Sequence, residues 1–163
     1  MGRFENAEVF RDTERMCREN GRLRAAIAAS REGQRLIVEG SAVDGVDLNR
    51  FDAAAQVVVS SKRTFEAAVA YAGRMRTCAH NFASATNPGG ERRLRRILDV
   101  AVANGAEAIV LGAFGCGAFR NDPKVVAAAA KTVISDYLHA FRVIEFAVYC
   151  RPGDTANYEA FAQ

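Results

Sequence analysis

The sequence has no run of apolar residues long enough to cross a bilayer, although half of its 163 residues are hydrophobic. A membrane-spanning helix needs about 20 such residues in succession. The first residues, Met1 to Asn6, also lack the apolar core of a secretory signal. We therefore expect a cytoplasmic protein without a membrane partner, folded as a single domain of residues 1–163 with an N-terminal helical region at residues 1–30.

Closely spaced cysteines, which would indicate a zinc site, are missing as well. The four cysteines are Cys17, Cys78, Cys116 and Cys150, and no two are close enough to form a paired ligand set. A chain of this length does not need disulfides to build a stable core. We expect four reduced, mostly buried thiols, no metal and no cofactor.

Aromatic residues are absent from the most basic stretch of the chain, residues 91–96, and the net charge is a mild +3. Single-stranded nucleic acid is bound by basic grooves in which bases stack on aromatic rings. The stretch fits better as the solvated face of a helix whose Leu94, Ile97 and Leu98 face the core. Nucleic acid is therefore not an expected partner.

The order of apolar and turn-forming residues predicts an alternation of strands and helices, and thus an α/β protein with a largely parallel or mixed sheet. Strands are expected at residues 35–39, 56–60, 77–83, 108–112 and 143–148. Helices are expected around residues 10–17, at 23–30, at 65–72 capped by Thr64, at 91–102, from Pro123 capped by Asp122 to about His139, and after Asp154 to Phe161.

Two glycine-rich loops follow predicted strands, at the carboxyl ends where ligands bind in such sheets. In residues 81–90, Asn87 offers a donor and an acceptor, while Gly89 and Gly90 allow close backbone approach. An ordinary Asn-Pro-Gly turn would have the same residues. Residues 112–123 hold three glycines before a helix, which suggests an amide nest for a phosphate, although a tight structural turn is the alternative.

The second loop matches neither the P-loop nor the dinucleotide fingerprint. Its two aromatic residues, Phe114 and Phe119, could pack on a ribose or an adenine. Cys116 is interpreted as a small turn residue, with a low-pKa nucleophile as the alternative. His80 is interpreted as a core histidine, and neither it nor His139 is expected to be catalytic.

In this order, the two loops resemble those of the bacterial poly(ADP-ribose) glycohydrolase-like macrodomain family. The resemblance rests on residues 81–90 and 111–123 and extends to flanking segments that cover nearly the whole chain. It implies a three-layer α/β/α macrodomain-like fold with a mixed sheet, and ADP-ribose or an ADP-ribosylated protein as partner. The implied ligand-binding residues are Asn81, Ala83, Asn87, Gly89 and Gly90 from the first loop, and Gly112, Phe114, Gly115, Cys116, Gly117, Ala118 and Phe119 from the second.

One departure from the family concerns catalysis. In the family, Asn-Pro-Gly-Gly continues with a third glycine, a Gln-Glu-Glu and further core strands, whereas here Gly90 is followed directly by Glu91. The sheet should therefore have fewer strands. Glu91 is the one nearby candidate for a catalytic acid, but a helix N-terminus favours the ionised carboxylate, which cannot donate the proton that glycosidic cleavage needs.

Three functions stay open from the sequence. The first is binding of ADP-ribose or a related nucleotide with impaired catalysis. The second is an active ADP-ribosyl glycohydrolase that uses Glu91 or a glutamate of a partner chain, and the third is a protein-interaction remnant. The polar residues Arg76, Thr77 and His80 suit a strand at the sheet edge, where a homodimer could form.

Overall fold

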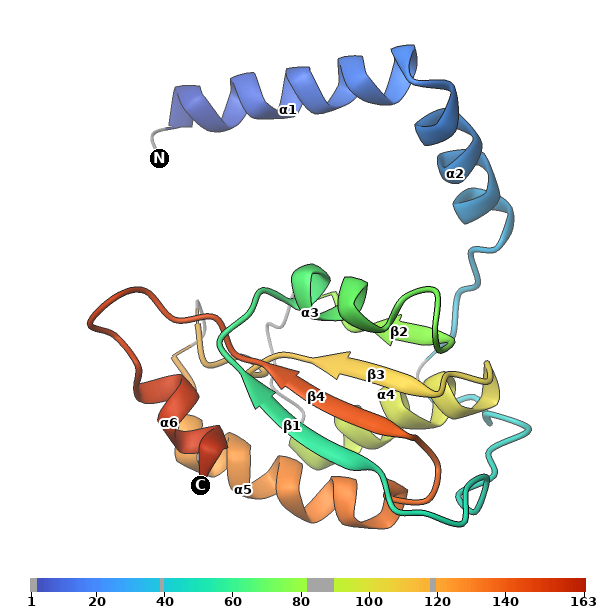
Figure 1. Ribbon diagram of the computed structural model, residues 1–163, viewed down its shortest axis with the longest axis vertical. Helices are drawn as coiled ribbons and strands as arrows, with labels where there is room; N and C mark the ends of the chain where they lie inside the picture. The colour runs from blue at the N-terminus through green and yellow to red at the C-terminus, as the bar shows by residue number, and fades with distance from the viewer. Residues whose placement is uncertain (1–2, 39, 82–89, 118–119) are drawn as a thin grey trace. The chain divides into compact units, whose positions relative to one another are not determined.

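The computed structural model describes residues 3–38, 40–81, 90–117 and 120–163. The chain divides into two compact units, Met1–Ser41 and Ala42–Gln163. The first unit contains the predicted N-terminal helical region, and the second contains the sheet with its helices (Figure 1).

The first unit consists of α1 (Arg3–Glu19) and α2 (Gly21–Glu32), which pack against each other. The break between them is where the sequence predicts it, because Asn20 caps α2. Its side-chain oxygen accepts hydrogen bonds from the backbone N–H of Arg22 at 3.0 Å and of Leu23 at 3.2 Å. A side-chain acceptor at this position satisfies amides that have no partner within the helix.

The prediction of a strand at residues 35–39 is wrong for residues 35–38, which the structure describes. Residues 35–38 are irregular and Glu39 lies outside the described residues. Leu36 is 91% exposed and Val38 is 61% exposed. An apolar run forms a stable strand only when a neighbouring strand takes up its peptide groups, and these residues pair with no strand of the described sheet.

The second unit is built on a parallel sheet. Its strands are β1 (Gln56–Ser60), β2 (Thr77–Ala79), β3 (Ala108–Leu111) and β4 (Val143–Ala147), in the order β1-β4-β3-β2. Each neighbouring pair is parallel. The four strands match predicted ones. Strand β2 ends at Ala79, although the backbone N–H of His80 still donates to Val110 of β3, and residues 82 and 83 of the predicted strand lie outside the described residues. As predicted, β2 lies at an edge of the described sheet, opposite β1.

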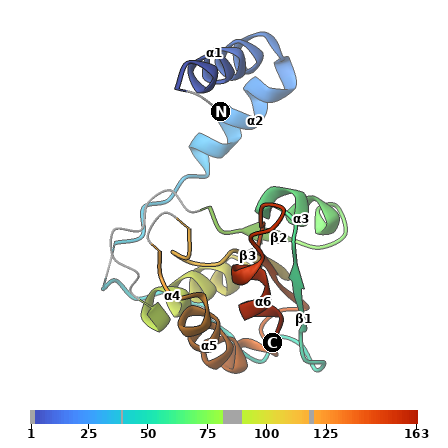
Figure 2. The ribbon, with the colours of Figure 1, turned by 90° about the vertical axis from the view of Figure 1, so that its left-hand side faces the viewer.

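Helices cover both faces of this sheet, which gives the predicted three layers (Figure 2). On one face lies α3 (Thr64–Tyr71), and on the other lie α4 (Gly90–Ala103), α5 (Pro123–Ile134) and α6 (Ala156–Ala162). Alternate residues of a strand point to opposite faces. Accordingly, Ile109 and Leu111 belong to the larger core beneath the sheet, while Val110 packs with Ala67 of α3.

The start of α3 lies one residue from the predicted cap. Arg63 is the N-cap residue, and the predicted cap Thr64 is already helical. The carboxylate of Glu66 accepts a hydrogen bond from the backbone N–H of Arg63 at 3.4 Å. This contact, from the third helical residue back to the cap, is half of a capping box, and it moves the boundary towards the N-terminus.

The start of α5 is as predicted. The carboxylate of Asp122 accepts a hydrogen bond from the backbone N–H of Lys124 at 2.9 Å, and Pro123 occupies the first helical position. The helix ends earlier than predicted, at Ile134, and continues as a 3₁₀ turn over Ser135–Tyr137. Proline suits the first position because its missing N–H would have no partner there.

The last helix starts one residue later than predicted. Thr155 rather than Asp154 stands before α6, and its hydroxyl donates to the carboxylate of Glu159 at 2.6 Å. Asp154 instead forms a bridge with Arg151, whose carbonyl accepts from its backbone N–H at 3.0 Å. Its backbone is therefore used by the turn that precedes the helix.

Candidate functional site

A cavity of about 250 Å³ lies at the carboxyl end of β3, between the first turns of α4 and α5. Its walls are mostly apolar, with Leu111, Phe146 and Phe161 among them, and a few polar groups converge on it. The carboxyl ends of parallel strands are where α/β proteins bind ligands. From the predicted site, the cavity brings together Glu91, Gly112 and Phe114, and it adds His80, Asn121 and Asp122.

Part of the predicted first loop lies outside the described residues, namely Ala83, Asn87 and Gly89, as do Ala118 and Phe119 of the second loop. Of the remaining first-loop residues, Asn81 is exposed and follows β2, and Gly90 begins α4. The described part of the candidate site therefore consists mainly of the second loop and the two helix N-termini beside it.

The turn after β3 uses several of its own amides. The backbone N–H of Cys116 donates to Ala113 at 3.2 Å, and that of Asn121 donates to Gly115 at 3.1 Å. Gly115 has φ = 74°, a left-handed conformation in which glycine is favoured. The amides of Gly115 and Gly117 have no acceptor within the described part of the chain. Of the amides predicted to hold a phosphate, these are therefore better placed than that of Cys116.

Cys116 does not have the environment of a nucleophile. Burial, together with the nearby negative charge of Asp122, raises the pKa of its thiol to about 11. The Sγ atom lies 3.8 Å from the carbonyl oxygen of Phe114. Because the thiolate is the reactive form, the alternative of a low-pKa nucleophile is wrong, and Cys116 is a buried turn residue.

Asn121 is a site residue to which sequence reasoning gave no role. Its side-chain Nδ2 is buried and has no hydrogen-bond partner among the described residues. A buried donor without an acceptor costs about 1–3 kcal/mol. Since Asn121 lines the cavity, an oxygen of a ligand placed there would satisfy this donor. In the sequence, its position between the glycines of the second loop and the Asp-Pro helix start was the one signal that could have marked Asn121 as a site residue.

His80 stands in the cavity wall, although the sequence favoured a core position. Its ring stacks on that of Phe114, with centroids 5.4 Å apart and planes inclined by 20°. Its backbone N–H donates to Val110 at 2.9 Å and so continues the pairing of β2 with β3. Burial lowers the pKa of the imidazole, which favours a neutral ring with one donor and one acceptor nitrogen.

Glu91 and Asp122 supply the acidic side of the cavity. Glu91 lies in the first turn of α4, where the sequence placed it, and its side chain is exposed. The carboxylate of Asp122 occupies the N-terminus of α5 through its bond to Lys124. A carboxylate at this position uses the same donors and partial positive charge as a phosphate would.

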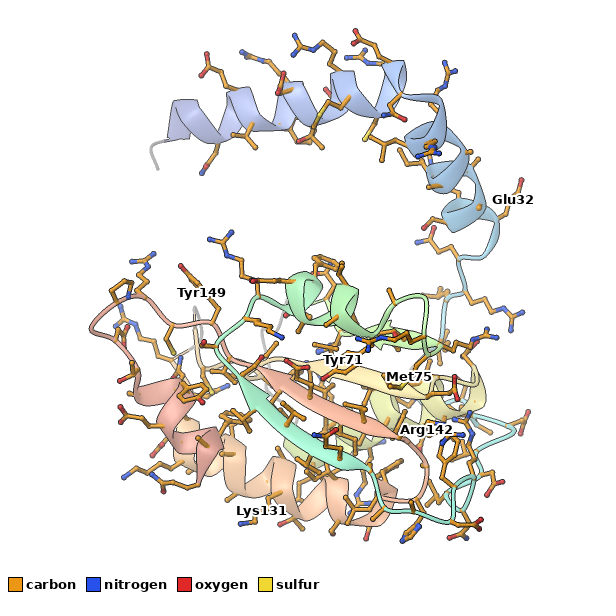
Figure 3. The ribbon with its side chains drawn as sticks, viewed as in Figure 1. Glu32, Tyr71, Met75, Lys131, Arg142 and Tyr149 are labelled. Carbon is orange, nitrogen blue, oxygen red and sulfur yellow. The ribbon has the colours of Figure 1, made fainter. Side chains whose placement is uncertain are left out.

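A second aromatic group lies at the same edge of the sheet, beyond the ends of β4 and β1. Tyr149 follows β4 and is 51% exposed (Figure 3). The guanidinium carbon of Arg63, which follows β1, lies 4.9 Å from the centroid of its ring. Such a contact between a cation and an aromatic face is attractive, and it holds both side chains beyond the carboxyl ends of β1 and β4.

Other kinds of site were sought within the described ranges. No group of three or more potential ligands for a metal ion occurs among the residues that the structure describes. The four cysteines are free thiols; Cys116 is buried, while Cys17, Cys78 and Cys150 are only half-buried, against the expectation that most would be buried. Among the described helices, none has the length and apolar character needed to cross a membrane.

The fold and the cavity place this chain in a structural class, namely α/β proteins of the macrodomain-like, three-layer type. Within that class, the fold is similar to that of the poly(ADP-ribose) glycohydrolase from Deinococcus radiodurans. In complex with ADP-ribose, that enzyme gives a TM-score of 0.72 at 22% identity over 83% of this chain and 95% of that chain. Its apo form gives a TM-score of 0.70 at 23% identity over 83% of this chain and 93% of that chain.

The poly(ADP-ribose) glycohydrolase from Thermomonospora curvata is a further structural relative. It gives a TM-score of 0.53 at 19% identity over 83% of this chain and 81% of that chain. At these identities the likeness establishes the shared fold. No family model and no curated protein matches the sequence.

Proposed function

We propose that this chain binds ADP-ribose or a closely related nucleotide in the cavity at the carboxyl end of β3. The observation that carries the proposal is the buried Nδ2 of Asn121, which has no hydrogen-bond partner among the described residues and lies in the wall of an otherwise largely apolar cavity. Two neighbouring amides, those of Gly115 and Gly117, have no acceptor in the described chain. The fold is shared with an enzyme solved in complex with ADP-ribose, which supports this choice of ligand.

In the proposed complex, the diphosphate lies against the amides of Gly115, Gly117 and Ala118. Asn87, Gly89 and Gly90 line the distal ribose, and Phe119 packs against the ligand, as the sequence resemblance implies. Successive amides in a glycine-rich turn bind an anion without a basic side chain. We therefore assign the anion to the turn, and the Asn121 donor to a nearby ligand oxygen.

We further propose that hydrolysis of the ligand is impaired. A glycoside hydrolase needs a carboxylic acid that protonates the leaving oxygen. Gly90 is followed directly by Glu91, where the resembled family continues with a Gln-Glu-Glu, and the exposed Glu91 at the start of α4 is the candidate left for this role near the first loop. Loss of a general acid typically lowers the rate by a factor of about 10²–10⁴.

One observation favours a second candidate, an active ADP-ribosyl glycohydrolase. Glu91 lines the same cavity as Asn121 and Gly112, so its carboxylate is placed to reach a bound ligand. Release of ADP-ribose from a modified protein, compared between the native chain and Glu91→Gln, decides between the two. The binder hypothesis predicts no release from either form, whereas release that Glu91→Gln abolishes would establish the enzyme.

The binding itself is tested by titration calorimetry of the full chain with ADP-ribose. Asn121→Leu should weaken binding by about tenfold, because one hydrogen bond of roughly 1.4 kcal/mol is lost. Asn49→Leu, on an exposed loop, is the matched control and should bind as the native chain does. No heat and no rise in melting temperature with ADP-ribose would leave the interaction-module hypothesis.

A further inference from the structure

The outer edge of the sheet at β1 has peptide groups that are not used by its neighbour. The backbone N–H of Gln56 donates to Arg142 at 2.9 Å, and the carbonyl of Ser60 accepts from Val148 at 2.7 Å. The even-numbered residues of β1 therefore bond towards β4. Because peptide groups alternate along a strand, those of Val57 and Val59 point outward, away from the sheet.

An apolar groove of about 410 Å³ runs beneath this edge, between β1, α5 and α6. Val57 and Val59 form one side of it, Ala127 and Ile134 of α5 form the other, and Phe161 of α6 contributes to its wall. Val57 is 44% exposed. An open edge beside such a groove has what a bound strand needs, namely main-chain partners and a pocket for alternate side chains.

The charged side chains along the groove have one sign. Among the described residues that line it, the two with charged side chains are lysines, Lys124 and Lys131. They are seven residues apart on α5 and so lie on the same side of the helix, about 10 Å apart along its axis. Figure 3 labels Lys131 on α5. Two lysines beside an apolar groove are complementary to a ligand that carries both apolar and acidic side chains.

We propose that this groove binds an extended acidic segment of another protein, which adds to the sheet as a strand beside β1. Apolar side chains of the segment enter the groove, and its carboxylates pair with Lys124 and Lys131. The site is separate from the ADP-ribose cavity proposed above and does not depend on it.

A second copy of this chain fits the same edge poorly. In a twofold-symmetric contact the same surface patch is contributed by both partners. Pairing of β1 with its symmetry mate would therefore bring Lys124 and Lys131 of both copies towards one interface, where like charges repel. An acidic segment has no such conflict.

The experiment selects ligands for the full chain from a displayed library of random twelve-residue peptides. Enriched peptides should alternate apolar residues with Asp or Glu. Their affinity, measured by fluorescence anisotropy, should fall at least tenfold for the double variant Lys124→Glu/Lys131→Glu. The double variant Arg92→Glu/Arg93→Glu changes the net charge equally at two exposed residues of α4, and it should bind like the native chain.

A backbone scan of the peptide separates strand addition from simple charge attraction. N-methylation at successive peptide positions should abolish binding at every second position, because alternate amides of an added strand bond to β1. The proposal is overturned by a lack of enrichment, by enriched peptides that bind both double variants equally, or by an N-methyl scan without a period of two. Self-association that blocks the peptide would also overturn it, in favour of a second copy.

Discussion

Among the described residues of the core, Glu145 is the one with a charged or polar side chain, and 1% of its surface is exposed. Both of its oxygens accept hydrogen bonds, one from the hydroxyl of Ser60 and one from the hydroxyl of Tyr71. Tyr71 belongs to α3, and its hydroxyl reaches this carboxylate of β4 across the contact between the helix and the sheet (Figure 3). A buried carboxylate is tolerated when donors replace the water it has lost, so this cluster ties α3 to β1 and β4.

Removal of one hydroxyl should therefore be costly. Tyr71→Phe leaves an oxygen of the buried Glu145 carboxylate without its donor, and we expect a loss of about 2 kcal/mol in the free energy of unfolding. Urea denaturation followed by circular dichroism measures it. The control is Tyr158→Phe on α6, whose hydroxyl has no described partner. Equal stability of the two variants would show that the Glu145 cluster contributes little.

The lowered pKa of the His80 ring should make the stability of the fold depend on pH. Its pKa in the folded chain is lowered from 6.5 by burial. Below pH 6.5 the unfolded state therefore binds more protons than the folded state, and stability falls as the pH falls. His80→Phe, which keeps a ring beside Phe114, should flatten this slope between pH 7 and 5. An unaltered slope in His80→Phe would contradict the assignment.

At the scale of an element, the N-terminus of α5 carries its own capping carboxylate close to the place where the proposed ligand's diphosphate would bind. The carboxylate of Asp122 bonds to Lys124, and its charge contributes to the raised pKa of Cys116. Asp122→Asn keeps a capping oxygen but removes the negative charge. We expect the affinity for ADP-ribose to rise about fivefold, because a repulsion of about 1 kcal/mol is removed.

The same variant has a second readout that does not depend on the ligand. With the charge of Asp122 gone, the thiol pKa of Cys116 should fall, and alkylation of Cys116 at pH 8 should become faster. The melting temperature should change little. If Asp122→Asn weakens ADP-ribose binding instead, the anion does not lie at this helix terminus.

The elements that the sequence predicts well are those whose signal is local. The predicted cap Asp122 marks a helix start that the structure has at the same residue, because capping depends on side chain and backbone within one turn. The strand expected at residues 35–39 was wrong for residues 35–38 since pairing depends on a distant partner.

The candidate site shows the same division. The glycine turn after β3 could be placed from the sequence, and the start of α4 was predicted at Glu91, one residue after its actual start at Gly90. The stacking of His80 on Phe114 and the unsatisfied donor of Asn121 could not. Both depend on how β2, β3 and α5 are brought together, and on which side chains are buried as a result. The open edge at β1 likewise became visible only with the strand order.

At the scale of the whole molecule, the edge at β2 leads to a prediction about assembly. The backbone carbonyl of Arg76 and the backbone N–H of His80 bond to β3, so the peptide groups of Thr77 and Ala79 point away from the described sheet. An exposed edge of this kind invites pairing with a second strand.

We expect a homodimer in which β2 pairs with β2 of a second copy, so that a light-scattering detector after size exclusion should report about twice the chain mass. Ala79→Pro removes an outward N–H and should give a monomer, whereas Val57→Pro at the opposite edge should stay dimeric. A native chain that elutes as a monomer at every concentration would rule out pairing through β2.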